Sequence, residues 1–498
     1  MSTQADEAAE LSPPRGRILR RIATYAPSSV VPAVLTMVTS VIFTRLFTPA
    51  AFGVYGLFLV VATTAKLVAT TWVTQGTGKY LPAATTVARR DEVKRAIFLS
   101  LVLVLVVEGA VGLLAMVVSY PISSPVNQGF LLPVLLFAVL TSAFEIVGNV
   151  FPAEHRAREY TTYKLIDSVA TFGLRLLLVS ALVRMDVRLM FWSVALSNLV
   201  LLPFMWRGAG LPSLTRTWSV FRSASSRRAT WTVAAFGFPM TLWFFSSILL
   251  DVGDRYVINY FLGAAPVGIY DANYRLIAGS VAVLVVPITI TLHPYLMGIS
   301  AKADTDHIGS VIATIVENLT LVGTVAVGLT YVFHQDIAKI MLGEKFREGS
   351  LVMPVVLAGV FLFNVGTFTH KPFEIVGRTR PMVAFGAAAA ATNLIACFVL
   401  IPVSGYVGAA YATLVAYSLY TVGVGVLGQR LIAWRLAVGR LLLRLVGIGV
   451  GTAAIWALRA GLMAVLPYWW ALFLSATVGG AVGGAVVLWL MRRSHPED

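Results

Sequence analysis

Charged residues and cysteine are both scarce in this sequence. Asp, Glu, Lys and Arg make up only 12% of the 498 residues, whereas aliphatic, aromatic and Cys residues make up 58%. The mean hydropathy of +0.82 lies well outside the range of soluble globular chains. The single cysteine, Cys397, excludes an internal disulfide and any cysteine-based metal site. This composition excludes a soluble globular domain.

Motifs for catalysis are absent as well. The sequence contains no Gly-x4-Gly-Lys-Ser/Thr loop for nucleotide phosphates and no His-Glu-x-x-His metal motif. No connection between apolar stretches is long enough for a soluble catalytic domain. We therefore predict that the protein is not an enzyme and needs no cofactor or metal ion.

The sequence has instead a series of apolar stretches between Thr24 and Leu490. A helix needs about 20 apolar residues to cross the hydrocarbon core of a bilayer, and roughly fourteen stretches meet this criterion. The predicted fold class is therefore an all-α polytopic membrane protein. Its second, fifth and eighth spans are expected near Phe52 to Trp72, Ile166 to Leu182 and Gly268 to Leu292.

Basic residues mark the orientation of these spans. The formal net charge of +15 and the pI near 10 could also indicate nucleic-acid binding. However, most lysines and arginines fall in every second loop, as the positive-inside rule describes for cytoplasmic loops. We therefore predict a multi-pass protein of the cytoplasmic membrane, with both termini in the cytoplasm and no nucleic-acid partner.

A short internal repeat is visible in the sequence. Leu46–Tyr55 aligns with Phe261–Tyr270 at a constant offset of 215 residues, which pairs Gly53 with Gly268. Chance could explain so short a match, since glycine recurs at turns and tyrosine at membrane interfaces. Six spans separate the copies, so two true repeats would have the same orientation in the membrane, which is a transporter architecture.

The repeat and the spans together predict the organisation of the chain. The last two spans fall outside the repeat and are rich in glycine and alanine, which suits close helix packing. The predicted parts are a disordered tail (1–14), a first lobe of spans 1–6 (15–206), a cytoplasmic linker (207–230), a second lobe of spans 7–12 (231–430), two additional spans (431–492) and a short tail (493–498).

Lys66 is the strongest candidate for a functional charge inside a span. A charged side chain at the bilayer centre costs about 2.5 to 3.5 kcal/mol on insertion scales, so its presence needs a reason. The spacing of Thr63, Lys66 and Thr70 places them on one helix face, which indicates a polar stripe toward an interior cavity. The alternative is a lysine that reaches back to the membrane surface, although Lys66 lies deep in its span.

Four arginines complete the candidate substrate site. Arg175 and Arg275 lie at membrane depth in the fifth and eighth spans, and Arg255 and Arg45 lie close to the ends of spans. Arg175 could instead form a structural ion pair with Asp167, Glu145 or Glu108. Arg275 could instead neutralise Asp271, which precedes it by four residues in the favourable order for an intrahelical pair.

Acids inside the spans are candidates for ion coupling. Carboxylates at membrane depth relay protons or bind cations in many pumps, but they also neutralise neighbouring arginines. The sequence leaves both roles open. The candidates are Glu108, Glu145, Glu317 and Asp271.

Three segments resemble the polysaccharide-transport branch of the multidrug/oligosaccharidyl-lipid/polysaccharide (MOP) exporter superfamily, the Wzx-like flippases. They are Phe43–Tyr55, Asp254–Tyr270 and Ile401–Thr413, and their order and positions relative to the spans are similar to those of that branch. The resemblance implies two six-helix lobes around a central cavity that opens alternately to each side, here with two extra C-terminal helices. Related lipid II flippases hold a diphosphate with basic residues of the second and eighth spans, which implies this role for Lys66 and Arg275.

The function expected from these features is export of a polyprenyl-diphosphate-linked oligosaccharide for the biosynthesis of cell-surface polysaccharide, such as lipopolysaccharide. Cationic residues would counter the diphosphate while the polyprenyl tail stays in the bilayer. Glycosyltransferases and a polymerase of the same pathway are the expected partners. One alternative is a cation-coupled multidrug exporter of the same fold, relying on the intramembrane acids. A membrane glycosyltransferase or polymerase is a second alternative, but it would need a large catalytic loop.

Introduced cysteines test the predicted orientation. Ser123 lies in the loop after the third span, and Ser225 lies in the long basic loop before the seventh. We expect a membrane-impermeant thiol reagent outside the cytoplasmic membrane to label Ser123→Cys but not Ser225→Cys. Labelling of both positions from the same side would contradict the topology.

Overall fold

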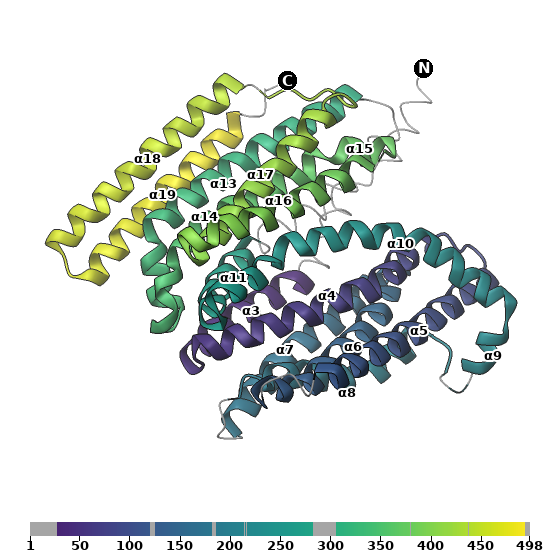
Figure 1. Ribbon diagram of the computed structural model, residues 1–498. Coiled ribbons are helices and arrows are strands. Elements are labelled where there is room, and N and C mark those ends of the chain that lie inside the picture. The colour runs from purple at the N-terminus through teal and green to yellow at the C-terminus, as the bar shows by residue number, and fades with distance from the viewer. Residues whose placement is uncertain are drawn as a thin grey trace, which may run out of the picture. The chain divides into compact units, whose positions relative to one another are not determined.

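The computed structural model describes residues 27–119, 125–181, 186–213, 215, 217–281, 305–378, 380–436 and 438–493. This described part consists of helices and their connections and contains no β-strand (Figure 1). The predicted N-terminal tail, Ser123 and the second half of the eighth predicted span lie outside it. The all-α fold class is therefore confirmed for the part of the chain that the structure describes.

The helices follow one another with short connections. A further helix, which carries no label in Figure 1, includes residues 264–281. In chain order the other helices are α3 (Pro27–Leu46), α4 (Pro49–Tyr80), α5 (Val87–Ser119), α6 (Pro125–Ala153), α7 (Ala157–Ala181), α8 (Leu189–Ala209), α9 (Thr217–Arg222), α10 (Ala224–Val252), α11 (Asp254–Leu262), α13 (Thr305–Met341), the 3-10 helix η3 (Glu344–Leu351), α14 (Val352–Thr369), α15 (Lys371–Val376), α16 (Arg380–Ser404), α17 (Tyr406–Gly428), α18 (Val438–Val465) and α19 (Tyr468–Arg493).

Twelve helices among the described residues are long and apolar enough to cross a membrane. Each of them coincides with one of the predicted spans. The fifth predicted span is α7, a helix of 25 residues whose polar side chains, including Lys164, Asp167 and Arg175, keep it below the same apolarity criterion. The eighth begins within 264–281 and continues outside the described residues. The count of fourteen therefore stays a prediction.

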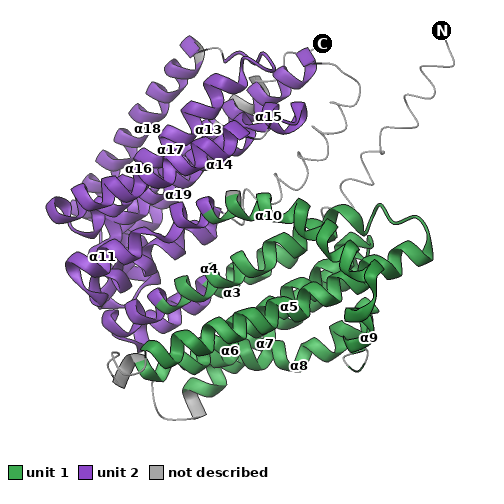
Figure 2. Cartoon of the chain, turned by 45° about the vertical axis from the view of Figure 1, so that its right-hand side comes forward, with its two compact units in different colours: residues 1–36, 58–245, 282–292 green, residues 37–57, 246–281, 293–498 purple. Residues whose placement is uncertain are grey.

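Two compact units divide the chain (Figure 2). Unit 1 contains residues 58–245 and two short segments, and unit 2 contains residues 37–57, 246–281 and the chain from 293 onward. Three helices, α3, α4 and α10, continue from one unit into the other. The predicted first lobe (15–206) differs from unit 1, because it includes residues 37–57, which belong to unit 2.

Unit 1 is built around helix α6, which packs against α5, α7 and α8. Its core is aromatic and aliphatic, with Ile146, Val147 and Phe151 of α6 fully buried. Helix α10 crosses α4 closely at Gly237, where a Cβ atom would lie 2.0 Å from the carbonyl oxygen of Trp72. Beside this crossing Trp72 stacks on Phe238 with ring centroids 5.3 Å apart.

Two basic side chains cap the C-terminal end of helix α8 in unit 1. Lys94 donates to the carbonyl oxygen of Ala209 at 2.8 Å, and Arg156 donates to that of Gly208 at 2.7 Å. Cations are favourable at a helix C-terminus, where carbonyl groups lack intrahelical partners. Hydrogen bonds to Glu159 raise the pKa of Arg156 above its ordinary value, so its guanidinium stays charged.

Unit 2 is a bundle in which α17 packs against α14 and α16, and α13 packs against α14. Helices α18 and α19 lie side by side and both contact α13 (Figure 1). The sequence predicted these two helices as an addition to the repeat. Their supporting helix is α13.

The repeat-matched glycines contact each other within unit 2. Helix α4 begins beside the helix of residues 264–281, and a Cβ atom at Gly53 would lie 1.8 Å from the carbonyl oxygen of Ala264. A Cβ atom at Gly268 would lie 2.0 Å from the carbonyl oxygen of Pro49. Real Cβ atoms do not approach backbone atoms so closely, so glycine is required at both positions. The repeated motif is thus a site of direct contact between its own two copies.

Alanine at Gly53 tests this contact. We expect Gly53→Ala to lower the free energy of unfolding by more than about 3 kcal/mol, because the new methyl group would force two backbones apart. The measurement is membrane accumulation together with thermal unfolding in detergent. Gly78→Ala, in the same helix and with no atom within 4 Å of the new Cβ, is the matched control and should accumulate normally. Equal accumulation of both variants would contradict the close crossing.

Candidate functional site

An ion pair between Lys66 and Glu145 lies inside unit 1. The Lys66 Nζ atom is 2.5 Å from Oε2 of Glu145, which α6 presents toward α4. The two side chains are 23% and 37% exposed. Lys66 lies near the middle of the 32-residue helix α4, so this partly exposed pair is at membrane depth. The partner of Lys66 is thus one of the acids that the sequence singled out.

Two further charged groups continue from this pair onto α7. Lys164 lies over the ring of Phe144 at 5.2 Å and interacts electrostatically with Glu145, Asp167 and Lys66. Asp167 accepts a hydrogen bond of 2.8 Å from Ser197 of α8. These groups, together with Arg175 and Glu108, are called the unit 1 charge cluster below.

Arg175 and Thr70, which were both placed on predicted polar helix faces, have different surroundings. Arg175 donates to the hydroxyl of Ser193 at 3.1 Å and interacts electrostatically with Asp167, so it lies between α7 and α8. Thr70, expected beside Lys66 on a polar stripe, is fully buried, and its hydroxyl has no hydrogen-bond partner among the described residues.

Glu108 lies at the wall of an apolar cavity in unit 1. The cavity has a volume of about 690 Å³ and is lined by side chains of α4, α5, α6 and α10, which are nearly all aliphatic or aromatic. The carboxylate is buried, and neither of its oxygens has a partner in hydrogen-bond geometry among the described residues. The hydroxyl of Ser142 lies near the carboxylate, outside hydrogen-bond geometry, and Lys66 interacts with it electrostatically. Glu108 is thus a second acid near Lys66, beside Glu145.

A buried network of two arginines and three aspartates lies in unit 2. Arg255 donates from Nη1 to Asp254 at 2.8 Å and from Nε to Asp271 at 3.2 Å. Asp271 also accepts from Nε of Arg275 at 2.5 Å. Asp251 contributes its carbonyl oxygen, which accepts a further hydrogen bond from Arg255. These residues, with the two tyrosines described next, are called the buried arginine network.

Two tyrosines of the helix 264–281 complete this network. The hydroxyl of Tyr270 donates to Asp254, and the hydroxyl of Tyr274 donates to Asp251. The guanidinium of Arg255 lies 4.2 Å from the ring centre of Tyr274. Every carboxylate of the network therefore has a donor, which is the condition under which buried charges are tolerated.

Arg255 and Arg275 differ in their access to the surroundings. Arg255 is only 2% exposed, and its guanidinium is fully engaged within the network, whereas the Arg275 side chain is 25% exposed. Asp271 bridges both, so the predicted pair of Asp271 and Arg275 is not isolated. The structure thus places Arg255 in helix packing and leaves Arg275 as the accessible cation of this region.

Two other predicted residues join helices of unit 2. Arg45 donates to the carbonyl oxygen of Ile340 at 2.6 Å, at the C-terminal end of α13. Glu317 of α13 forms an ion pair with Arg444 of α18. These contacts account for both charges locally, so neither needs a substrate or a coupling ion as its partner.

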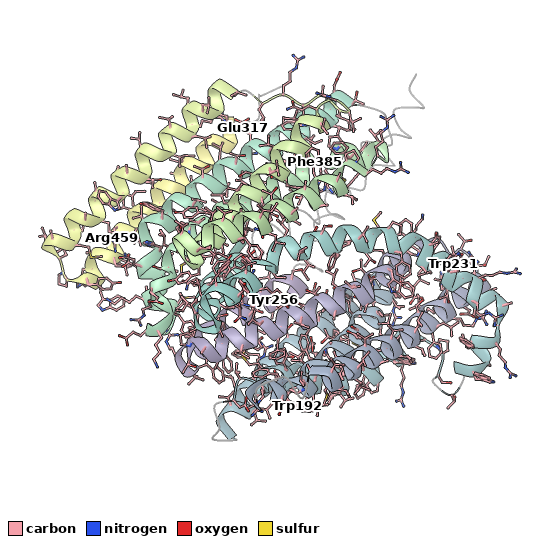
Figure 3. All side chains as sticks on the ribbon, in the orientation of Figure 1. Trp192, Trp231, Tyr256, Glu317, Phe385 and Arg459 are labelled. Carbon is pink, nitrogen blue, oxygen red and sulfur yellow. The ribbon has the colours of Figure 1, made fainter. Side chains whose placement is uncertain are left out.

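The sequence reasoning missed the acid that pairs with Arg459. Asp336 of α13 accepts from Arg459 of α18 at 2.7 Å and from the hydroxyl of Tyr468 of α19 at 2.8 Å. Figure 3 shows the labelled Glu317 and Arg459 well separated along the α13 and α18 helices. Arg459 lies inside the thirteenth predicted span, and the sequence offers no acid in that span to pair with it. This was the signal that an acid lies opposite it on another helix.

A comparison with known protein families identifies the family of this chain. A family described as "Polysaccharide biosynthesis protein" matches residues 18–300, which is more than half of the sequence. The chain belongs to the polysaccharide biosynthesis protein family. The resemblance based on Phe43–Tyr55, Asp254–Tyr270 and Ile401–Thr413 is thereby confirmed. A comparison with curated proteins finds no significant match.

Solved structures similar to this family member include a flippase and two transporters. One is a "Lipid II flippase MurJ, inward closed conformation", with a TM-score of 0.63 at 11% identity, over 94% of this chain and 99% of that one. Another is an inward-facing multidrug resistance MATE family transporter of the MOP superfamily, with a TM-score of 0.63 at 13% identity, over 80% and 94%. The Vibrio cholerae MATE transporter VcmN in the bent form has a TM-score of 0.51 at 14% identity, over 84% and 97%.

These similarities establish the fold. The family member has a polytopic helical membrane fold similar to that of a MATE transporter of the MOP superfamily, and its hydropathy and the twelve apolar helices of the described residues also indicate such a fold. Lys66 belongs to unit 1 and Arg275 to unit 2, so the sharing of one cavity by these two residues stays a prediction.

Substitution of Asp271 tests the buried arginine network. We expect Asp271→Asn to lower the free energy of unfolding by about 3 to 5 kcal/mol, because it leaves buried arginines without their shared acid. Glu145→Gln removes one carboxylate from a partly exposed pair and should cost about 1 kcal/mol or less. Thermal unfolding of both purified variants in the same detergent is the measurement. A larger loss for Glu145→Gln would contradict the difference in burial.

Proposed function

We propose that this protein moves a polyprenyl-diphosphate-linked oligosaccharide from the inner to the outer leaflet of the cytoplasmic membrane by alternating access. Membership of the polysaccharide biosynthesis protein family supports a lipid-linked glycan as the cargo. The fold, which is similar to that of a lipid II flippase, supports transport across a bilayer. In this proposal both termini are cytoplasmic, and glycosyltransferases and a polymerase of the same pathway are partners.

The observation that carries the proposal is the partial exposure of the Lys66 and Glu145 pair at membrane depth. A sealed ion pair between two helices would only hold them together, as in the buried arginine network. A pair whose side chains remain about a quarter to a third accessible can exchange its partner. Because hydrocarbon does not solvate such charges, the open side of the pair requires water or a polar ligand.

A diphosphate is the ligand that suits Lys66. It would replace the carboxylate of Glu145 at Nζ, and Lys164 and Arg175 would add positive charge along α7. A bound anion with its glycan could not cross hydrocarbon unaided, whereas the polyprenyl tail can remain in the bilayer. Arg275, the partly exposed arginine of the buried arginine network, would meet the same diphosphate.

Release of Glu145 offers a way to couple transport to an ion gradient. When the substrate occupies Lys66, Glu145 and the neighbouring Glu108 would carry two uncompensated negative charges in a poorly solvated region. A proton or a monovalent cation would neutralise one of them. We therefore assign the coupling role to Glu108 and Glu145, and regard Asp271 and Glu317 as structural because each already pairs with arginine.

Export of hydrophobic cations is a second candidate function. The apolar cavity of about 690 Å³ beside Glu108 has the size of a drug-binding pocket. However, both carboxylate oxygens of Glu108 are covered. A cation in the cavity would reach them only after the side chain rotates, which makes this candidate weaker than the flippase.

Replacement of Lys66 tests the proposed function. We expect Lys66→Ala to lower export of the lipid-linked oligosaccharide at least about tenfold, since a charge-assisted hydrogen bond to the diphosphate contributes about 1.5 to 3 kcal/mol. Lys66→Arg should retain much of the activity, because a diphosphate accepts either cation. The measurement is appearance of the oligosaccharide on the outer leaflet, normalised to the amount of protein in the membrane. Full export by Lys66→Ala would overturn the mechanism.

Arg275 requires a separate test because it also supports Asp271. If Arg275 binds the diphosphate, Arg275→Ala should lower export while Arg275→Lys retains part of it. The double variant Asp271→Asn with Arg275→Gln removes both partners of one ion pair, but it also takes Asp271 from Arg255, so its export is normalised to the amount of folded protein. Wild-type export by this double variant would remove Arg275 from the proposed site.

A further inference from the structure

A basic and aromatic surface lies on unit 1, on α9 and the beginning of α10. Residues 207–228 contain five arginines and no Asp or Glu. Of these five, Arg222, Arg227 and Arg228 are exposed and close together in the sequence. The proposed transport cycle uses none of them, so this surface has no role yet.

Helix α9 holds two aromatic side chains away from the protein. Val220 is buried and packs against Phe98 and Leu99 of α5, which fixes one face of the helix. Trp218 and Phe221 are 64% and 53% exposed, and their rings stack with centroids 6.1 Å apart. A helix turns by about 100° per residue, so Trp218 lies on the side opposite Val220. The anchored helix therefore presents its large rings to the surroundings.

The arginines are arranged around these rings. The guanidinium of Arg222 lies 4.8 Å from the ring centre of Trp218. Arg227 donates to the carbonyl oxygen of Phe221 at 3.2 Å, at the C-terminal end of α9. Trp231, three residues after Arg228 and labelled in Figure 3, is a further exposed aromatic residue at the beginning of α10. Three aromatic rings and three guanidinium groups thus gather within one short stretch, called the α9 surface below.

We propose that the α9 surface binds the headgroups of anionic phospholipids in the cytoplasmic leaflet. Trp and other amphipathic aromatic side chains prefer the headgroup level of a bilayer, and α9 immediately precedes α10, a helix of membrane-spanning length. Arginines near an anionic membrane surface are attracted to it, and no acid of this stretch opposes that attraction. An acidic protein would also attract the arginines, but it gives no reason for three exposed aromatic rings beside a transmembrane helix.

This inference does not depend on the proposed cargo. The stretch connects α8 to α10, and α10 continues from unit 1 into unit 2. Binding of headgroups would hold the beginning of α10 at the membrane surface. The activity of the protein should then depend on the content of anionic lipid in the cytoplasmic leaflet.

A fluorescent probe on α9 tests the proposal in the full-length protein. Cys397 is fully buried, so an introduced Ser219→Cys provides an accessible thiol for an environment-sensitive label while both rings remain. The labelled protein is placed in nanodiscs that contain the same amount of either brominated phosphatidylglycerol or brominated phosphatidylcholine. We expect the anionic quencher to act at least about threefold more strongly than the neutral one, and this preference to fall in high salt.

Two triple variants decide whether the α9 arginines cause the preference. Arg222→Gln, Arg227→Gln and Arg228→Gln together should abolish it. The matched control removes the same charge from three exposed arginines on the same predicted side of the membrane, with Arg378→Gln, Arg430→Gln and Arg435→Gln, and should retain it. Equal loss in the control would show an effect of net charge and overturn the site. Equal quenching by both lipids, or no quenching by either, would overturn lipid binding and leave the surface to a protein partner.

Discussion

The close crossing of α4 and the helix 264–281 is the contact on which the charged interior of unit 2 depends. With no side chain between Gly53 and Gly268, backbone lies against backbone, and this fixes the distance between the two helices. One turn further along, a Cβ atom at Gly56 would lie 3.1 Å from the carboxylate of Asp271. The acid thus uses space that a glycine leaves free, and from there it reaches both arginines of the buried arginine network.

The protein holds charge inside an apolar bundle in two different ways. In unit 2 the aspartates and Arg255 bond to one another in the interior, so breaking one of these pairs is costly, and of the two arginines only Arg275 is partly exposed. In unit 1 the pair of Lys66 and Glu145 is incompletely covered, and a second acid, Glu108, has no hydrogen-bond partner among the described residues. The first arrangement supports the fold, and the second can change its partners. This difference is the basis for assigning transport chemistry to unit 1.

Hydropathy predicted the fold because a bilayer permits few structures, and each described apolar helix matches a predicted span. Lys66 could be predicted to face a polar interior because a charged side chain in contact with hydrocarbon costs a large free energy. Its partner could not be predicted, since Glu108 and Glu145 were equally available in the sequence and only the rotation of α5 and α6 separates them. The contact of Arg45 could not be predicted either, because nothing in the sequence around it indicates a hydrogen bond to the C-terminal end of a helix 295 residues away.

The attachment of α18 and α19 to α13 limits how this protein can be shortened. Glu317 and Asp336 of α13 each take their arginine from α18, and Asp336 also takes a hydroxyl group from α19. A chain that stopped after α17 would resemble a complete twelve-span transporter by hydropathy alone. It would nevertheless retain two carboxylates with no counter-charge on a helix exposed to lipid. The pair of helices α18 and α19 is therefore needed in the bundle, because the acids of α13 depend on it for their partners.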